Sequence, residues 1–372
     1  PASPDLTHLK YETITSNNIG VDFGLFSDKV NFTFELYKKV TDDLLQKKMK
    51  VPSSTGLSTV AWYNSGKIQN KGWEFNIDIA AVKTKDWSFN FGFNISQNKN
   101  EILELPENKN DELYTFGNKN YAYSVMMGDP LGSFYGYRYK GVYQNVEETY
   151  AVNTSGQRIL DIDGNPVVMK NGDQKVYPGD ARYEDVNGDG VIDENDIVYL
   201  GNSNPTLTGG LNFTLRYKKV SLVAAFHGRA GQKVINQARM DMENMRGKNN
   251  QSVAVLRRWR SEGDDTDIPR ALYDKGYNYL GSDRFVEDAS FLRLKTVTLK
   301  YQMPAKWMKA IGVNKLELYA TGYDMFVWTK YKGQDPEVNL KAANDGTVAQ
   351  VAIDSNNTPK PFKIAFGLNL NF

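Results

Sequence analysis

Phe362-Lys-Ile-Ala-Phe-Gly-Leu-Asn-Leu-Asn-Phe372 alternates apolar residues with polar or small residues without a break. In a β-strand, alternate side chains face opposite sides, so this segment has one apolar face and one polar or small face. The strands of a membrane β-barrel have this pattern, with lipid outside and water or a plug domain inside. An edge strand of a soluble sheet can show it too, so the pattern indicates a barrel only if it recurs.

The same alternation recurs along most of the chain, for example over residues 73–79, 87–95 and 211–217. Membrane-spanning strands need about 9–11 residues, whereas ordinary strands average about 5–6. Several of the alternating runs reach the longer figure. We therefore expect an all-β chain forming a transmembrane antiparallel β-barrel, with nine long strands near 10–26, 30–45, 67–82, 87–103, 206–217, 220–231, 289–303, 315–328 and 362–372.

The connections between these strands alternate in length. Residues 27–29, 83–86 and 218–219 form short turns, and 304–314 reads as a helical turn. Long loops are expected near 46–66, 104–205, 232–288 and 329–361. Short periplasmic turns with long extracellular loops are typical of outer-membrane barrels, whereas a soluble sandwich has no reason to sort its loops by side.

Nine strands would run the first and last strand in the same direction. Bacterial barrels close with antiparallel neighbours and an even number of strands. The sequence therefore predicts the C-terminal part of a larger barrel, unless a further strand lies within 104–205.

Composition excludes several classes of protein. The chain has no Cys and a net charge of +1, which rules out disulfides and gives no argument for binding nucleic acid. No apolar run reaches about 18 residues, so a transmembrane helix is not expected. The N-terminal sequence around Pro1 does not resemble a signal peptide. His8 and His227 carry no partner motif, and no hydrolase or phosphate-binding motif occurs, so we expect no enzyme.

Asp185-Val-Asn-Gly-Asp-Gly-Val-Ile-Asp-Glu-Asn-Asp196 has the oxygen spacing of a calcium-binding loop. Gly190 occupies the sixth position, where such loops turn sharply, and Asp replaces the usual Glu at the twelfth. The alternative is a solvated loop of Asx-turns without an ion. A structural Ca²⁺ is predicted, held by Asp185, Asn187, Asp189, the Val191 carbonyl, Asp193 and Asp196.

Several further blocks of sequence stand out along the chain. They are Gly132-Ser-Phe-Tyr-Gly136-Tyr, Gly179-Asp-Ala-Arg-Tyr-Glu-Asp185 with its calcium-like continuation, Gly201-Asn-Ser-Asn-Pro205 with Thr-Leu-Thr-Gly209-Gly210, Ser290-Phe-Leu-Arg-Leu-Lys295, Tyr319-Ala-Thr-Gly322, Gly333-Gln-Asp-Pro336-Glu337 and the terminal strand. Together these blocks resemble the SusC/RagA family of TonB-dependent outer-membrane transporters of Bacteroidetes. The blocks follow the family's order over most of the chain.

The resemblance implies a 22-strand barrel that passes many times through the bacterial outer membrane. It also implies a plug domain outside this chain, a SusD-like surface lipoprotein as lid, and energy from TonB-ExbB-ExbD through the absent N-terminal part. The terminal strand, with Phe366, Leu368, Leu370 and Phe372, would serve as the signal for insertion into the lipid bilayer.

The function expected from this resemblance is active import of oligosaccharides or peptides. Aromatic rings in the long loops are candidate ligand contacts because sugars stack on flat ring faces. Such rings also pack loops together or line membrane interfaces, as we expect for Trp73, Trp87 and Trp307 beside the short turns. A secreted, calcium-stabilised carbohydrate-binding or adhesion module is the alternative function. For import, the aromatic residues of the long loops predicted to contact the ligand are Trp62, Tyr63, Tyr135, Tyr137, Tyr139, Tyr143, Trp259 and Tyr331.

Overall fold

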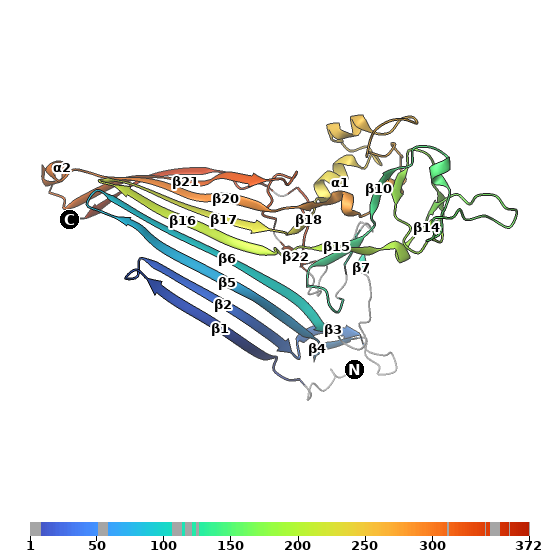
Figure 1. The fold of residues 1–372 in the computed structure, drawn as a ribbon. Helices are drawn as coiled ribbons and strands as arrows, with labels where there is room; N and C mark the ends of the chain where they lie inside the picture. The colour runs from blue at the N-terminus through green and yellow to red at the C-terminus, as the bar shows by residue number, and fades with distance from the viewer. Residues whose placement is uncertain are drawn as a thin grey trace.

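The computed structural model describes residues 9–50, 59–105, 114–115, 121–123, 126–310, 312–338, 340–342, 350–356 and 358–371. One long, curved antiparallel sheet dominates it (Figure 1). All nine predicted strands are confirmed to within a few residues. They are β1 (Thr13–Leu25), β2 (Val30–Asp42), β5 (Lys67–Lys83), β6 (Trp87–Glu104), β16 (Leu207–Tyr217), β17 (Val220–Ala230), β20 (Phe291–Gln302), β21 (Lys315–Thr329) and β24 (Lys363–Asn371).

Each strand of this sheet pairs with the next in chain order, from β1 to β24. Strands β1 and β24 are its two edges and do not pair with each other in the described part of the chain. The short strands between 104 and 205 join other, smaller sheets, so the predicted count of nine stands. The sheet is open in Figure 1, and a closed barrel wall needs additional strands.

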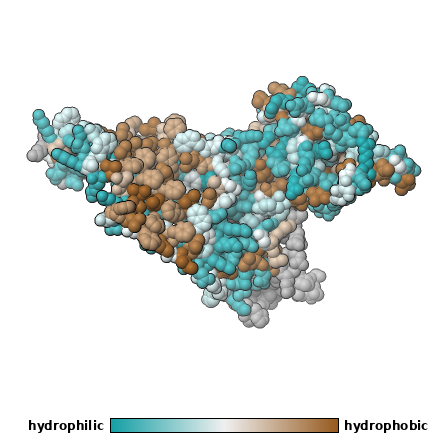
Figure 2. Space-filling model, viewed as in Figure 1, coloured by the Kyte–Doolittle hydropathy of each residue, from teal (hydrophilic) through white to brown (hydrophobic). Residues whose placement is uncertain are grey.

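The register gathers the alternating apolar residues on the outer face of the sheet. Phe23 faces Phe32 across β1 and β2 with ring centroids 5.2 Å apart, and Phe89 lies 6.3 Å from Phe213. Figure 2 shows the result as a hydrophobic band that crosses the strands, with hydrophilic surface beyond both ends. A soluble sandwich would cover this face with a second sheet, whereas here Phe366 remains 82% exposed. The band therefore fits the lipid-facing wall of a membrane barrel.

The opposite face is polar and linked by hydrogen bonds between neighbouring strands. Thr33 donates to Asp22 over 2.6 Å, and Ser96 lies 2.8 Å from Thr208. A wall that is apolar outside and polar inside is the arrangement that the alternation predicted.

Tight turns and one short helix close the end of the sheet that carries the short connections. Phe26, Ser27 and Asp28 all have positive φ in the turn between β1 and β2. Helix α2 (Ala305–Ala310) confirms the predicted helical turn. Among the residues that the structure describes, no helix combines the length and apolar character needed to cross a membrane.

Aromatic residues mark both margins of the hydrophobic band. Trp87 packs against Tyr217 at 4.3 Å beside the short turns, and Trp307 lies in α2 at the same end. The prediction for Trp73 was wrong. Strand β5 is 17 residues long, so Trp73 lies toward its other end, where its indole N–H donates to Gln97 over 2.7 Å. It belongs to the aromatic margin on the long-loop side.

The final strand places its apolar residues on the outer face. Phe366, Leu368 and Leu370 pair with Ala320, Leu318 and Leu316 of β21, and Phe372 lies outside the described residues. Their role as an insertion signal stays a prediction.

Short elements form within the long loops, on the side of the sheet opposite the short turns (Figure 1). They are β3 (Leu45–Lys50), β4 (Thr59–Asn64), β7 (Tyr114–Thr115), β8 (Ala122–Tyr123), β9 (Ser133–Gly136), β10 (Tyr139–Val142), η2 (Glu147–Thr149), β11 (Lys170–Asn171), β12 (Gln174–Lys175), β13 (Ala181–Tyr183), β14 (Val191–Ile192), η3 (Glu194–Asp196), β15 (Val198–Asn202), β18 (Lys233–Ile235), α1 (Gln237–Glu243), η4 (Val253–Arg257), η5 (Tyr277–Tyr279), η6 (Asp283–Phe285), β19 (Val286–Asp288), β22 (Leu340–Ala342) and β23 (Gln350–Ala352).

Replacing Phe91 with Arg tests the orientation of the sheet. Phe91 lies on the outer face between Ile79 and Phe213, well inside the hydrophobic band. An arginine near the middle of a bilayer costs about 2–4 kcal/mol, so we expect Phe91→Arg to lower the unfolding free energy of the bilayer-inserted full-length protein by this amount. Asn90→Arg, one residue away on the polar face, is the matched control and should be much milder. Equal losses in denaturant titrations would contradict the orientation.

Candidate functional site

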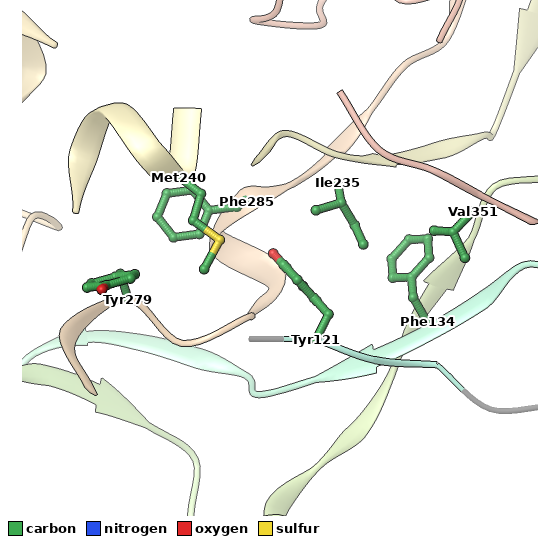
Figure 3. Packing of buried hydrophobic residues seen from close by; sticks show 7 residues of the cluster. All are labelled: Tyr121, Phe134, Ile235, Met240, Tyr279, Phe285 and Val351. Carbon is green, nitrogen blue, oxygen red and sulfur yellow. The ribbon is translucent and has the colours of Figure 1, made fainter. Parts of the chain in front are cut away.

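The three long loops after residue 104 pack into one body at the end of the sheet. Tyr121 and Phe134 come from the first of them, Ile235 and Phe285 from the second, and Val351 from the third, yet they share one buried apolar cluster with Met240 and Tyr279. Figure 3 shows Tyr121 between the Met240–Phe285 side and the Phe134–Val351 side of this cluster. The Tyr121 hydroxyl donates to the Ser282 carbonyl over 2.8 Å. The loops are therefore held together by a common core.

Most of the aromatic residues predicted to contact ligand lie within this loop body. Tyr135 is 4% exposed and donates to Asp129 over 2.5 Å, while Tyr331 is 6% exposed and donates to Asp354 over 2.7 Å. Tyr143 is buried in a second core cluster. Burial raises the pKa of the Tyr135 and Tyr331 hydroxyls, and the neighbouring carboxylates raise it further. These three rings pack the loops in this structure, and ligand contact by them stays a prediction.

Tyr137 and Tyr139 are brought together around a third tyrosine. Their ring centroids lie 5.7 Å and 5.9 Å from that of Tyr183. The Tyr139 hydroxyl donates to the Asp267 carbonyl over 2.6 Å, which joins the first loop to the second. Burial, aided by the Asp196 carboxylate, raises the pKa of Tyr137 to about 12. The Tyr137 hydroxyl therefore stays protonated at neutral pH, while the single O–H of Tyr139 is used by Asp267.

The remaining predicted contacts are Trp62, Tyr63 and Trp259. Trp62 lies on β4 and is partly exposed, and Tyr63 pairs with Gln46 through the β3–β4 ladder. Trp259 lies against Gly179, where an added Cβ would come within 2.3 Å of its ring, and its indole N–H donates to Gln144 over 3.2 Å. Trp259 therefore lies beside Tyr143, since Gly179, which it contacts, donates to the Tyr143 carbonyl over 2.7 Å.

The calcium-like loop is closed by its own hydrogen bonds. The Asp185 carboxylate accepts backbone N–H groups from Gly188 and Gly190, each over 2.8 Å. Gly190 has φ +84°, as expected for the glycine of a sharp turn. Asp196 is fully buried and accepts from Val186 and Asp193 over 2.7 and 2.9 Å, and burial raises the pKa of its carboxyl.

This geometry supports the turn but does not gather a ligand shell. Within the described ranges, no group of three or more acidic or histidine side chains is placed so that it could hold a metal ion. The carboxylates are instead turned toward backbone N–H groups, as in the Asx-turn alternative. Calcium binding stays a prediction.

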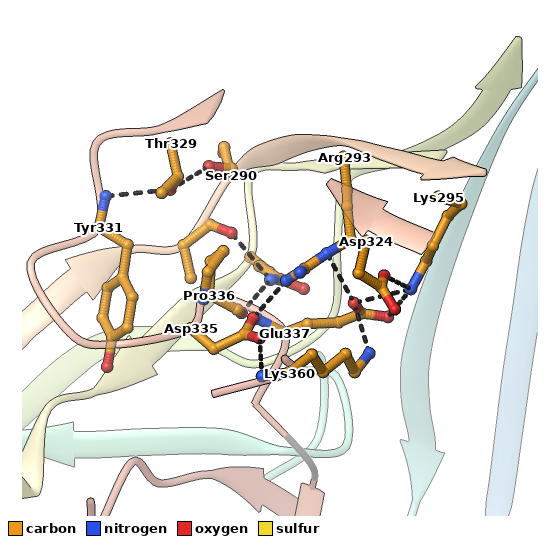
Figure 4. A network of polar contacts seen from close by, with 12 residues as sticks. Ser290, Arg293, Lys295, Asp324, Thr329, Tyr331, Asp335, Pro336, Glu337 and Lys360 are labelled. Carbon is orange, nitrogen blue, oxygen red and sulfur yellow. Dashed lines mark hydrogen bonds and ion pairs between the residues drawn. The ribbon is translucent and has the colours of Figure 1, made fainter. Parts of the chain in front are cut away.

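An ionic cluster joins the third long loop to the inner wall of the sheet (Figure 4). Arg293 of β20 is 3% exposed, and its Nη2 lies 2.5 Å from Asp335. Its Nε lies 3.3 Å from Glu337, an ion pair without hydrogen-bond geometry. Lys295 and Lys360 lie 3.2 and 2.6 Å from the same Glu337 carboxylate. The cluster fixes residues 335–337 against β20.

The charge balance of this cluster keeps Glu337 ionised. Burial alone would favour its neutral form, but hydrogen bonds from Lys360 and Lys295 outweigh burial and lower the pKa of Glu337 to about 2. The carboxylate is therefore charged at any physiological pH. The uncharged Gln232 side chain also connects these segments, because it donates to the carbonyls of Ala289 and Pro336 over 2.9 and 3.1 Å.

A second buried ion pair joins the first long loop to the second. Asp180 is fully buried and accepts from Arg270 Nε over 2.7 Å and Nη2 over 3.2 Å. Asn278 and the Tyr177 backbone N–H complete its hydrogen bonds.

Sequence reasoning did not assign either ion pair. Asp180, Arg293, Asp335 and Glu337 occur in the blocks quoted above for their resemblance, 179–185, 290–295 and 333–337, whereas Arg270 lies outside these blocks. An acidic residue beside proline in one block, matched by a cation in another block, is the signal that could have suggested the ion pairs of Arg293.

No family model matches the chain. The TonB-dependent receptor P26 of Formosa agariphila is 32% identical over 378 residues, covering 100% of this chain and 35% of that receptor. The TonB-dependent receptor SusC of Bacteroides thetaiotaomicron is 28% identical over 376 residues, covering 98% of this chain and 32% of SusC. The chain is homologous to TonB-dependent receptors, SusC among them. Its fold agrees, because the RagAB peptide transporter superimposes with a TM-score of 0.73 at 24% identity, over 98% of this chain and 36% of that chain.

The chain spans about a third of the length of the TonB-dependent receptors that it matches. The described sheet corresponds in fold to one part of the superimposed structure, with its loop body on one side. These relatives are receptors and transporters, in agreement with the prediction that the chain is not an enzyme.

Proposed function

We propose that the protein containing this chain actively imports oligosaccharides or peptides across the bacterial outer membrane. The observation that carries the proposal is a barrel wall, apolar outside and polar inside, whose long loops pack into one body over one end. Homology to TonB-dependent receptors, SusC among them, along the whole chain supports the same function. This part would supply a section of the wall and a large share of the extracellular surface.

The proposal includes TonB as the energy source and a SusD-like lipoprotein as the lid. Support for TonB comes from the names of the relatives, and support for the lid comes from the family resemblance. The ligand class stays open between peptide and oligosaccharide. The superimposed RagAB structure is described as a peptide transporter, while the tyrosines and tryptophans of the loops suit stacking on sugars.

Purification of the full-length protein from its native outer membrane in detergent tests the proposal. We expect a surface lipoprotein to co-purify, and mass spectrometry of the extracted complex should identify a bound oligosaccharide or peptide. A soluble protein that needs no detergent and has no partner would contradict import and favour the secreted module instead.

We also propose a structural Ca²⁺ in loop 185–196, supported by the spacing of its oxygen side chains and the left-handed backbone at Gly190. Asp185, Asp189 and Asp193 would turn toward the ion, which would pin the loop. Chelation should then raise the rate of proteolytic cleavage at this loop about tenfold or more. Asp185→Ala combined with Asp189→Ala should cleave rapidly with or without chelator, and Asp173→Ala is the control outside the loop. Equal cleavage of the unmodified protein in calcium and in chelator would remove the ion from the proposal.

A further inference from the structure

Three lysines form a row across the outer wall just beyond the hydrophobic band. Lys38 of β2 pairs with Lys71 of β5, and Lys71 pairs with Lys99 of β6. All three side chains are exposed. In Figure 2 the hydrophobic band gives way to hydrophilic surface where these strands approach the long loops.

The row of lysines faces outward because each lysine lies two residues from Leu36, Trp73 or Gln97, which are level with one another at the edge of the hydrophobic band. Leu36 pairs with Trp73, and Trp73 pairs with Gln97. The register is unbroken between these positions, so Lys38, Lys71 and Lys99 share the face of Leu36 and Trp73. The lysines are therefore on the lipid side of the wall and not in the lumen.

The height of the row matches the head groups of a bilayer. Trp73 and Val82 on β5 are separated by about 30 Å along the strand at about 3.3 Å per residue, or about 21–25 Å along the membrane normal for a strand tilted by about 35–45°. This is the height of the apolar band of a membrane barrel, about 25 Å. Lys71 lies about 5 Å further along the normal, where lipid head groups begin.

Three like charges placed directly opposite one another repel and need counter-charge. Glu101 supplies part of it, at 3.6 Å from Lys71 and 3.8 Å from Lys99. Lys38 has no carboxylate within ion-pair distance among the residues that the structure describes. An excess of positive charge therefore remains at this level of the wall.

The lysines line a hollow that also has apolar side chains in its wall, beside Asn17 and Gln97. Its volume is about 490 Å³, and Ile19, Leu36 and Trp73 line it together with Lys38, Lys71 and Lys99. The apolar residues belong to the hydrophobic band, so the hollow is continuous with the surface that meets lipid tails. A ligand that fits both the lysines and the apolar side chains has an anionic head and an apolar body.

We propose that this hollow binds a phosphate-bearing lipid of the outer leaflet, on the side of the long loops. Lysine ammonium groups would hold the phosphate, and the acyl part would lie along Ile19, Leu36 and Trp73. A bound lipid would brace β1, β2, β5 and β6 at the base of the loop body. The inference rests on the barrel fold and its orientation, not on what the barrel transports.

Native mass spectrometry of the full-length protein in a neutral detergent, titrated with phosphorylated lipid A, tests this site. A lysine near an anionic lipid contributes about a fivefold gain in affinity, so combined Lys38→Gln, Lys71→Gln and Lys99→Gln should weaken binding about a hundredfold. The charge-matched control replaces Lys29, Lys83 and Lys85, at the short-turn end, with Gln and should bind as the unmodified protein does. Unchanged heat-dependent gel mobility would show that each variant is folded.

Two further titrations identify the ligand. Lipid A stripped of phosphate should bind the unmodified protein as weakly as phosphorylated lipid A binds the triple variant, and inorganic phosphate at equal concentration should not compete. Equal binding of the stripped lipid, competition by inorganic phosphate, or undiminished binding to the triple variant would each overturn the proposal.

Discussion

Replacing Arg293 with Ala should release the third long loop from the barrel wall while the sheet stays folded. Arg293 is the buried cation between Asp335 and Glu337, and its removal leaves Asp335 without its ion-pair partner. Breaking a buried ion pair by removing one partner costs about 3–5 kcal/mol. The open state of segment 333–338 should therefore become about a hundred to several thousand times more populated.

Hydrogen exchange followed by mass spectrometry on the full-length protein measures this opening. Peptides covering 333–338 should lose protection in Arg293→Ala, while peptides from β5 and β6 should not change. Arg216→Ala is the matched control, since Arg216 lies in the same sheet, is exposed and has no ion pair in the described part of the chain. Protection of 333–338 equal to that of the control would show that the cluster does not hold the loop.

Arg293→Lys distinguishes charge from geometry. A lysine keeps the positive charge but loses the planar fork that reaches Asp335 and Glu337 from two nitrogens. We expect intermediate protection, since Lys295 and Lys360 still neutralise Glu337. Protection as low as in Arg293→Ala would mean that the fork geometry, rather than the charge, holds the segment.

The sheet could be predicted from sequence because lipid imposes the same rule on every strand. Each of the nine strands must carry an apolar residue at alternate positions along its span, so a period of two is visible without knowing its neighbours. The polar face and the short turns followed from the same periodicity. Trp73 was misplaced because it was assigned to the nearest turn in a strand long enough to reach both margins of the band.

The loop body could not be predicted in this way because contacts between distant segments decide its structure. Phe134, Ile235 and Val351 meet in one core although about a hundred residues separate each from the next. The short strands of the loops carry too few residues for a period to be seen. The tyrosines of the loops were ambiguous for the same reason, since a ring that packs a core and a ring that binds sugar look alike in sequence.

The largest effect on the loop body is expected from Asp180→Ala. Asp180 accepts two hydrogen bonds from Arg270, one from Asn278 and one from the Tyr177 backbone, and it is fully buried. Removing it leaves these donors unsatisfied and deprives Arg270 of its partner, at a cost of about 3–5 kcal/mol. Because the ion pair joins the first long loop to the second, both loops should become sensitive to protease together.

Limited proteolysis of the full-length protein, with cleavage sites mapped by mass spectrometry, measures the protease sensitivity of both loops. Asp180→Ala should speed cleavage within both 143–183 and 259–280, whereas Asp163→Ala, at an exposed turn of the same loop, should leave both rates unchanged. Cleavage confined to 143–183 would show that the second loop is held independently of the pair.

A double-mutant cycle separates the ion pair from the other hydrogen bonds of Asp180. If the pair dominates, Arg270→Ala added to Asp180→Ala should cost little more than Asp180→Ala alone, because the stranded guanidinium is then gone. Asp180→Asn keeps the shape and removes the charge, but its single amide oxygen can accept from Asn278 or from the Tyr177 N–H and not from both, so it should lose the ion pair and one further hydrogen bond. Additive losses of unfolding free energy in the cycle would mean that Asp180 acts mainly through Asn278 and the backbone. Arg270 would then stabilise the second loop by packing on Tyr177, because the Arg270 guanidinium carbon lies 5.6 Å from the centroid of the Tyr177 ring.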